Sequence, residues 1–157
     1  MFEPKKEQKA TNVKKKRKKP VMPSTRVKHI FEEAGYTTQF VERFVPHARR
    51  RYDFLGCGDV MAMCAGKPLV LIQTFTTQWN QHRNKIILGE EPAALEGLKL
   101  WLQCGKNNKF IFVGFHKRQI IRGQKRYKWF ARYGRVKLTK KGNIKLIEVD
   151  TLEEAIK

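Results

Sequence analysis

The amino-acid sequence predicts an α/β domain with a central mixed β-sheet flanked by helices. Stretches with helical spacing of apolar residues alternate with short stretches rich in β-branched and aromatic residues. One of the latter, residues 69–72, is an unbroken apolar run, which is typical of a central strand covered on both faces. Hydrophobic residues make up 41% of the 157-residue chain, which is enough for the core of one domain.

The expected elements run in the order helix, three strands, two helices and further strands. Ser24 is the expected N-cap of the first helix, which extends through Ala34, and Gly35 suits its C-terminal end. Three strands follow at residues 37–45, 59–63 and 69–76, and then two helices at residues 78–88 and 92–103. Strands at residues 109–115 and 127–133 are joined by a basic hairpin that turns at Gly123, and a weakly alternating segment with a short helix ends the chain.

Residues 1–23 form a separate compositional unit, in which we expect a disordered basic arm. Nine Lys or Arg stand there against two Glu, apolar residues are few, and Pro20 and Pro23 close the segment. Such an arm could lie along phosphates or serve as a localisation signal, and a solubilising tail is the alternative. Residues 24–157 form the expected folded domain, which is also basic, with 25 Lys and Arg against 12 Asp and Glu.

The charge of the whole chain indicates a polyanionic partner. It holds 34 Lys and Arg against 14 Asp and Glu, a formal net charge of +20. A field of this sign attracts phosphate backbones, because binding releases condensed counterions. We therefore expect nucleic acid as the partner. No Walker-type or GxGxxG loop is present, so nucleotide hydrolysis has no support.

The sequence also predicts the compartment. No apolar run approaches the ~20 residues of a membrane span, and the N-terminus lacks the apolar core of a signal peptide. We expect no membrane contact and a cytoplasmic location, in the host cytoplasm if a phage encodes the chain. Cys57, Cys64 and Cys104 form no CxxC pair, so we expect small buried hydrophobes in a reducing compartment, with a zinc site as the alternative.

Four oxygen-bearing side chains lie near the ends of the predicted strands: Glu42, Asp53, Asp59 and Gln73. Asp59 starts one strand and Gln73 lies near the end of the next, so the two can face each other across a strand pair. Mg²⁺ binds oxygen ligands and typically uses one or two carboxylates together with water and phosphate. Taken singly, Asp53 is more readily explained as a turn cap or a salt-bridge partner, and a hydrogen bond within its strand's surroundings is nearly as good an explanation of Gln73.

The order of these residues resembles the PD-(D/E)xK nuclease superfamily, and within it small Holliday-junction-resolvase-like and VRR-NUC-like phage or bacterial nucleases. The resemblance covers about residues 24–120, and the matching residues are Glu42, Asp53, Phe54, Leu55, Gly56, Asp59, Val60, residues 69–73, His82, Lys85, Trp101, Leu102, Gly105, Val113, Gly114 and Phe115. It implies one restriction-endonuclease-like domain over residues 24–157. It also implies a Mg²⁺- or Mn²⁺-dependent endonuclease acting on duplex or branched DNA, and a homodimer, because resolvases of this kind act as dimers.

The resemblance assigns roles by position. It implies a catalytic set of Asp59, Gln73, Glu42 and Lys85, and a metal-binding set of Asp59, Asp53 and Gln73. Asp59 takes the place of the central metal-binding aspartate, and Gln73 takes that of the acid in the (D/E)xK pair. The sequence departs from the pattern at Phe75, where the lysine is expected. Lys85 could supply the missing ammonium if its helix packs over the site, and Asp53 could supply the missing carboxylate.

Basic residues on both sides of the acids are expected to bind nucleic acid. The first group is Arg49, Arg50 and Arg51, and His82 is a further expected phosphate contact, with a solvated helix face as its alternative. Between residues 116 and 135, cations are interleaved with aromatic side chains in a hairpin that suits a duplex groove or backbone. The expected binding residues there are Lys117, Arg118, Arg122, Lys125, Arg126 and Lys128. The alternative places the aromatic residues in the core and the charges on a solvated face.

Three functions remain open from the sequence. The first is the metal-dependent nuclease. The second is a catalytically inactive nucleic-acid-binding protein of the same fold, for which the neutral Gln73 and the apolar Phe75 argue. The third is a basic structural component of a nucleoprotein assembly. The sequence does not distinguish DNA from RNA.

Overall fold

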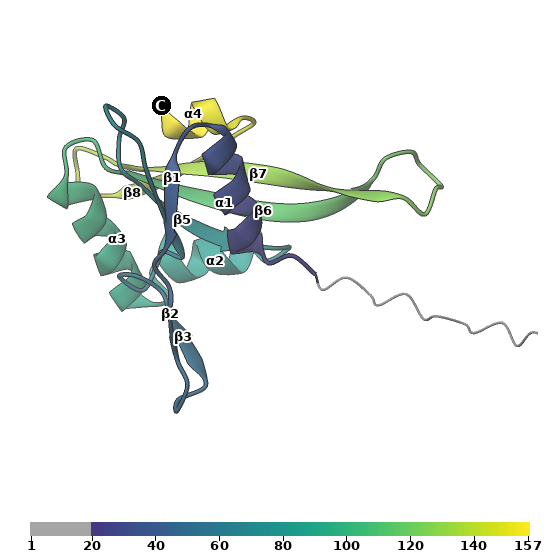
Figure 1. Ribbon diagram of the computed structural model, residues 1–157. Helices are drawn as coiled ribbons and strands as arrows, with labels where there is room; N and C mark the ends of the chain where they lie inside the picture. The colour runs from purple at the N-terminus through teal and green to yellow at the C-terminus, as the bar shows by residue number, and fades with distance from the viewer. Residues whose placement is uncertain (1–19) are drawn as a thin grey trace, which may run out of the picture.

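Residues 20–157, which the computed structural model describes, form four helices and eight strands (Figure 1). The helices are α1 (Pro23–Glu33), α2 (Trp79–Ile86), α3 (Pro92–Cys104) and α4 (Leu152–Ile156). The strands are β1 (Thr37–Phe40), β2 (Arg43–Val45), β3 (Arg50–Tyr52), β4 (Val60–Met63), β5 (Val70–Phe75), β6 (Lys109–Gln119), β7 (Tyr127–Leu138) and β8 (Ile144–Val149). The predicted arm at residues 1–23 lies mostly outside the described residues, and Pro23 already belongs to α1.

Six strands form one mixed sheet in the order β1-β4-β5-β6-β7-β8. Strands β5 and β6 are parallel, and α2 and α3 form the crossover between them, whereas the other neighbouring pairs are antiparallel. Helices cover both faces of this sheet (Figure 1). The prediction of an α/β domain with a mixed sheet flanked by helices is therefore confirmed. Within residues 20–157, no helix combines the length and the apolarity that crossing a bilayer requires.

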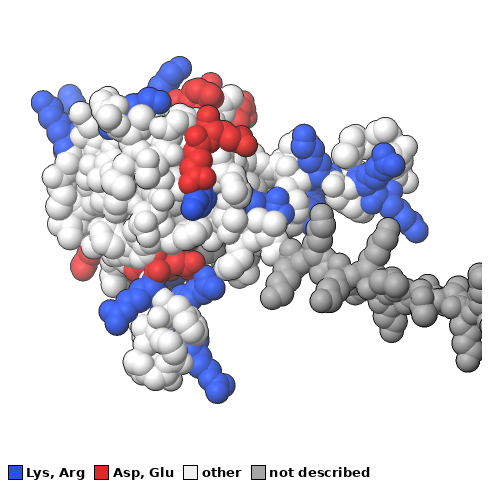
Figure 2. All heavy atoms as spheres, in the orientation of Figure 1, with Lys and Arg blue, Asp and Glu red and all other residues white. Residues whose placement is uncertain are grey.

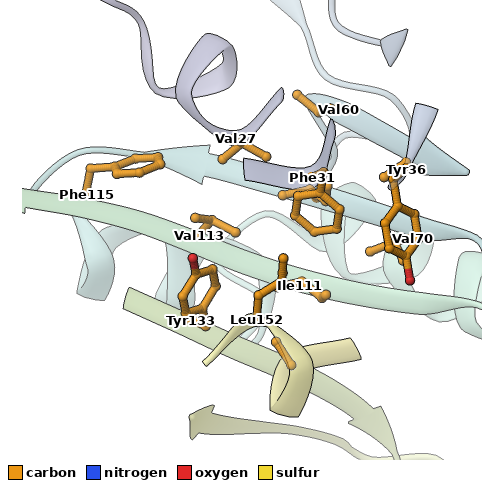
Figure 3. Packing of buried hydrophobic residues seen from close by; sticks show 13 residues of the cluster. Val27, Phe31, Tyr36, Val60, Val70, Ile111, Val113, Phe115, Tyr133 and Leu152 are labelled. Carbon is orange, nitrogen blue, oxygen red and sulfur yellow. The ribbon is translucent and has the colours of Figure 1, made fainter. Parts of the chain in front are cut away.

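One face of the sheet is covered by α1 and α4 over an apolar core (Figure 3). Val27 and Phe31 of α1 are fully buried there. They pack against alternate residues of the strands, such as Val70 of β5 and Ile111 of β6. This alternation is the period of two that a β-strand imposes on its side chains.

The opposite face is covered by α2 and α3. Leu71 and Phe75 of β5 point to this side and are buried together with Trp79 of α2 and Leu98 of α3. Gln73, which lies between Leu71 and Phe75 in the alternation, faces the same side and is only 3% exposed. The two faces of β5 thus differ, because only the α2/α3 face buries a polar side chain of this strand.

The N-cap of the first helix lies two residues earlier than predicted. Met22 is its N-cap and Pro23 occupies the first turn, so the expectation that Ser24 is the cap is wrong; Ser24 lies buried inside the turn. Proline suits this position because its fixed φ is already helical. The predicted C-terminal end is confirmed, since Gly35 adopts a φ of 85° and its N–H donates to the Glu32 carbonyl at 3.0 Å.

The single strand predicted at residues 37–45 is wrong. Strand β1 pairs with β4 in the main sheet, whereas β2 pairs with β3 in a separate two-stranded hairpin. Between β1 and β2 the N–H groups of Val41 and Glu42 both donate to the Asp59 carbonyl, at 2.9 and 3.3 Å. Because one carbonyl takes both donors, the ladder ends at Phe40, and the β2–β3 hairpin projects away from the sheet (Figure 1).

Strands β6 and β7 run further than predicted. The apolar alternation of β6 ends at Phe115, but antiparallel pairing continues to Gln119 opposite Tyr127. Residues 116–130, here called the β6–β7 arm, extend from the body as a long ribbon (Figure 1). Beyond this arm, the weakly alternating C-terminal segment forms β8 and the short helix α4.

Candidate active site

Asp59 directly precedes β4 and binds the end of β5. Its Oδ2 accepts three hydrogen bonds, from Gln73 Nε2 at 2.9 Å, the Thr74 N–H at 2.8 Å and Thr74 Oγ1 at 3.0 Å. The Asp59 N–H donates to the Ile72 carbonyl at 2.9 Å, and the residue is 6% exposed. Asp59 and Gln73, which the sequence predicts to face each other, are thus in direct contact.

Asp53 lies close enough to Asp59 for its charge to raise the pKa of Asp59. Burial raises the pKa of Asp59 to about 7; the hydrogen bonds from Thr74 lower it, and the charges of Asp53 and Glu42 raise it. The pKa of Asp53 is raised as well, first by burial, although the Lys85 ammonium lowers it. The two carboxyls therefore influence each other's titration.

A tight turn over residues 53–58 positions Asp53. The Gly56 N–H donates to the Asp53 carbonyl at 3.0 Å, and the Phe54 N–H donates to the Gly58 carbonyl at 2.8 Å. This turn lies directly on α3, because a side chain at Gly97 would collide with the Leu55 carbonyl. The absence of a side chain at Gly97 therefore allows the turn that carries Asp53 to pack closely on α3.

Helix α2 brings Lys85 to the acid pair. Its Nζ lies 4.0 Å from Asp53 Oδ2 and 3.3 Å from Glu91 Oε2. The helix is fixed over this face of the sheet by Trp79 and Ile86, which are both buried. The hypothesis that Lys85 supplies an ammonium to the site requires such packing, and the structure provides it.

Glu42 borders the site without a direct bond to the acid pair. Its charge raises the pKa of both Asp53 and Asp59, so it lies near them. Its Oε1 accepts a hydrogen bond from Arg51 Nη1 at 2.7 Å, across the β2–β3 hairpin. Glu42 therefore ties the hairpin to the edge of the site.

Gln73 offers an oxygen that fits a cation. Its Nε2 is used in the bond to Asp59, whereas its buried Oε1 accepts no hydrogen bond from the described residues. A buried carbonyl oxygen without a donor is unfavourable. Among residues 20–157, no group of three or more His, Cys, Asp and Glu is arranged to hold a metal ion. The predicted set of Asp59, Asp53 and Gln73 is instead two carboxyls and one amide oxygen, a combination within the range that Mg²⁺ uses.

Phe75 is part of the core rather than of the acid site. It is 4% exposed, and its ring stacks on His82 with 4.5 Å between ring centroids. The pKa of His82 is lowered, first by burial and then by Lys85. The predicted phosphate contact at His82 is therefore a neutral imidazole near pH 7, which can form a hydrogen bond but does not attract phosphate by charge.

Cys57 lies beside the acid pair and is not suited to be a nucleophile. Burial raises its thiol pKa to about 12, and the charges of Asp53 and Asp59 contribute. A thiol that stays protonated is unreactive. The expectation of a small buried hydrophobe is confirmed for Cys57, but it is wrong for Cys104, which is exposed.

A pocket beyond the C-terminal end of β5 was not predicted. It has a volume of about 210 Å³ next to the C-terminal end of β5, and its lining includes Phe75, Trp79, His116, Arg118 and Arg132. The Arg132 guanidinium stacks on Trp79, 4.1 Å from the ring centroid, and also pairs with Glu148 at 2.6 Å. The alternation within β7 places Arg132 on one face of the strand, but its contact with a helix 53 residues earlier depends on tertiary packing that local sequence does not reveal.

Apart from His82 on α2, the predicted nucleic-acid-binding residues lie on the two projecting hairpins. Arg49, Arg50 and Arg51 are exposed on the β2–β3 hairpin. The other group, also exposed, lies on the β6–β7 arm: Lys117, Arg118, Arg122, Lys125, Arg126 and Lys128. Figure 2 shows Lys and Arg on both projections. Of the aromatic side chains in the arm, Tyr127 and Phe130 are exposed and Trp129 is partly buried, so neither sequence alternative holds for all of them.

No protein-family model matches the chain, and neither a curated protein nor a solved structure is significantly similar to it.

Proposed function

We propose that this protein is a Mg²⁺-dependent DNA endonuclease with a restriction-endonuclease-like domain, and that Asp59, Asp53 and Gln73 hold its metal. The observation that carries the proposal is the buried carboxyl of Asp59 close to the half-buried carboxyl of Asp53, beside the Oε1 of Gln73, which accepts no hydrogen bond from the described residues. Two neighbouring carboxyls repel each other when both are ionised, and a divalent cation removes that repulsion. The succession of one helix, three antiparallel strands of the sheet, a helical crossover and a parallel strand is consistent with the resemblance found in the sequence.

Each residue of the site has a distinct role in the proposed reaction. Bound Mg²⁺ supplies Lewis-acid activation of a water and of the scissile phosphate. Thr74 orients Asp59 through two hydrogen bonds to Oδ2, which leaves Oδ1 free of the described hydrogen bonds and open to the metal. Lys85 lies close enough to Asp53 to stabilise negative charge that develops on the phosphate. Glu42, held by Arg51, adds negative charge at the border of the site.

Basic side chains extend from the C-terminal end of β5 along the β6–β7 arm, where we expect the DNA backbone to lie. The pocket lined by His116, Arg118 and Arg132 begins at the end of β5, one residue beyond Thr74. Arg118 and Lys128 face each other across the arm and extend the same positive surface outward. A DNA backbone along this surface would reach the acid pair without crossing an acidic patch on the arm, because residues 116–135 contain no Asp or Glu.

A second candidate function is binding of nucleic acid without cleavage. It is favoured by Phe75, which occupies the lysine position of the resembled pattern and is stacked in the core. In that case the positive surface remains, while the acid pair no longer supports hydrolysis. Cleavage assays distinguish the two functions, because binding without cutting is the result that the second one predicts.

The test is cleavage of duplex, branched and single-stranded DNA by the full chain in Mg²⁺ or Mn²⁺. We expect cutting by the unmodified protein and a loss of at least about 10³-fold in rate for Asp59→Asn, because the metal loses a ligand charge. Asp150→Asn is the matched control, since Asp150 is exposed between β8 and α4 and no described side-chain bond involves its carboxylate. Binding to DNA that survives with no cutting of any substrate supports the second function instead.

A further inference from the structure

The tip of the β6–β7 arm carries two exposed isoleucines amid cations. Ile120 is 59% exposed and Ile121 is 55% exposed. They lie where the ribbon turns, since the Ile120 N–H donates to the Arg126 carbonyl at 3.1 Å and the Gln124 N–H donates to the Ile121 carbonyl at 3.1 Å. Two adjacent branched apolar side chains at the end of a charged ribbon are not explained by packing, because neither belongs to a core cluster of the described residues.

The two faces of the arm differ, and one of them continues the acid site. A side chain at Gly114 would meet Phe75 and Trp79 of the α2/α3 core. Because alternate residues of a strand share a face, His116 and Arg118 lie on the same face as Gly114. Across the ladder, Phe130 lies opposite His116 and Lys128 lies opposite Arg118, and they therefore share it. This cationic face is continuous with the side of β5 from which Gln73 binds Asp59.

The other face of the arm is braced by the body. Trp129 packs against the α1 core, and its ring receives the Arg26 guanidinium of α1 at 4.8 Å and Lys117 Nζ at 4.9 Å from the centroid. An arm held in this way at its base keeps its tip at a fixed distance from the acid pair. Phe112 pairs with Gln73, and Ile120, which directly follows β6, lies eight residues further along the chain, which corresponds to about 26 Å at ~3.3 Å per residue.

We propose that Ile120 and Ile121 form a wedge that enters a base step of bound DNA and unstacks it. This inference rests on the proposed function for its partner. Apolar side chains on basic ribbons can partially unstack a base step when the surrounding cations hold the backbone. At about 3.4 Å per base pair, the wedge acts within roughly eight base pairs of the cleaved phosphate. Steps that are already unstacked at a branch cost less to open, so the wedge favours branched over uninterrupted duplex DNA.

The charge around Ile120 and Ile121 indicates which partner binds the tip of the arm. A second copy of the chain is disfavoured, because residues 116–135 carry no acid and the whole chain has a formal net charge of +20. A polyanion fits, and nucleic acid is preferred over an anionic lipid surface because the cationic face leads from the tip to the acid pair. Lipid binding becomes an outcome of the experiment.

The experiment places single 2-aminopurine bases at successive positions of a duplex and of a four-way junction. Fluorescence is recorded with the full chain in EDTA, and the cut is mapped on the same DNA with Mg²⁺. We expect the unmodified protein to raise the fluorescence at least about threefold at positions six to nine base pairs from the cut, as unstacking requires. The double variant Ile120→Ser and Ile121→Ser should lose this rise, whereas Leu100→Ser, at a residue 51% exposed on α3, should keep it.

The outcomes separate the wedge from the nuclease. Cleavage by the unmodified protein without a fluorescence rise at any position overturns the wedge and leaves the proposed function intact. A rise that persists in the double variant also overturns it. Absence of both DNA binding and cleavage overturns the proposed function and the wedge together. Binding to phosphatidylserine vesicles that is lost in the double variant, with no response on DNA, replaces the wedge by a membrane contact.

Discussion

The two faces of the central sheet differ in the polarity of the side chains that they bury. The α1/α4 face is an apolar core in which side chains such as Val27, Phe31 and Ile111 are fully buried. The α2/α3 face also has an apolar core, but Asp59 and Gln73 are buried at its edge, 6% and 3% exposed. Two neighbouring residues of one strand, Ile72 and Gln73, thus point into environments of different polarity.

The buried polar residues of the α2/α3 face are expected to lower the stability of the fold. Burial of an ionisable group is unfavourable unless its charge is compensated, and the pKa of Asp59 is raised to about 7 for this reason. Among residues 20–157, no carboxyl or amide side chain is buried on the α1/α4 face, where Ser24 of α1 is the buried polar residue. Variants on the two faces should therefore separate stability from function.

The largest effect on stability is expected from the apolar face. Phe31→Ala should lower the free energy of unfolding by about 3–5 kcal/mol, because it leaves a cavity under α1. Urea denaturation measures this loss, with Phe31→Leu as a milder variant that remains folded. Phe44→Ala, at a residue 56% exposed, should change stability by less than about 0.5 kcal/mol. An equal loss in both alanine variants would show that the α1 face is not the main core.

On the α2/α3 face, substitution of the buried Asp59 is expected to raise the free energy of unfolding. Because the folded-state pKa of Asp59 lies above its ordinary value of 3.8, folded protein binds the proton more tightly, and stability falls as pH rises from about 4 to about 7. Asp59→Asn removes this loss and should stabilise the metal-free protein at pH 8 by about 2–4 kcal/mol. The gain should shrink at pH 5. Thermal unfolding in EDTA at the two pH values measures it, and a destabilised Asp59→Asn at pH 8 would contradict the assignment of a strained carboxyl pair.

Substitution of Lys85 tests whether its ammonium, next to Asp53, contributes to the proposed cleavage. Lys85→Met should lower the cleavage rate about 10–100-fold, because the ammonium next to Asp53 is lost. The pKa of Asp53 should rise in this variant, so the pH–rate profile should shift toward higher pH. Lys145→Met, at an exposed position of β8, is the matched control. Unchanged kinetics in Lys85→Met would remove Lys85 from the proposed catalytic set.

The smallest effect is expected on the arm. Lys128→Gln should reduce the slope of log K against log salt by about 0.9, the value of one phosphate contact on duplex DNA. Lys141→Gln makes the same charge change in the turn between β7 and β8, away from the arm, and should leave the slope nearly unchanged. Fluorescence anisotropy with labelled duplex at several salt concentrations measures both. Equal slopes for the two variants would argue against a backbone path along the arm.

The predictable parts of this molecule are those that local periodicity encodes. Helices at residues 78–88 and 92–103 and the strand at residues 69–76 were predicted within one or two residues of α2, α3 and β5, because apolar spacing decides them. The segment at residues 37–45 was not, since its division depends on Asp59 receiving two backbone donors from a distant part of the chain. The strand β6 was predicted too short, because its residues 116–119 are polar or charged and carry no apolar alternation.

The candidate site follows the same rule. Asp59 and Gln73 could be paired from the sequence, because they lie at the ends of two adjacent antiparallel strands. The contact of Lys85 with Asp53 required the packing angle of α2, which no local pattern gives. The stacking of Arg132 on Trp79 was missed for the same reason, since the residues meet only after the crossover has placed α2 beneath β7.

The most direct measurement is a ¹³C NMR titration of the aspartate carboxyl carbons, with and without Mg²⁺. In EDTA, Asp59 should titrate with an apparent pKa of about 7, coupled to Asp53. Saturating Mg²⁺ should lower both pKa values by at least about two units, because the cation binds only the ionised carboxyls. An Asp59 pKa near 4 in EDTA, or one near 7 that Mg²⁺ does not change, would contradict a metal-binding carboxyl pair on this face of the sheet.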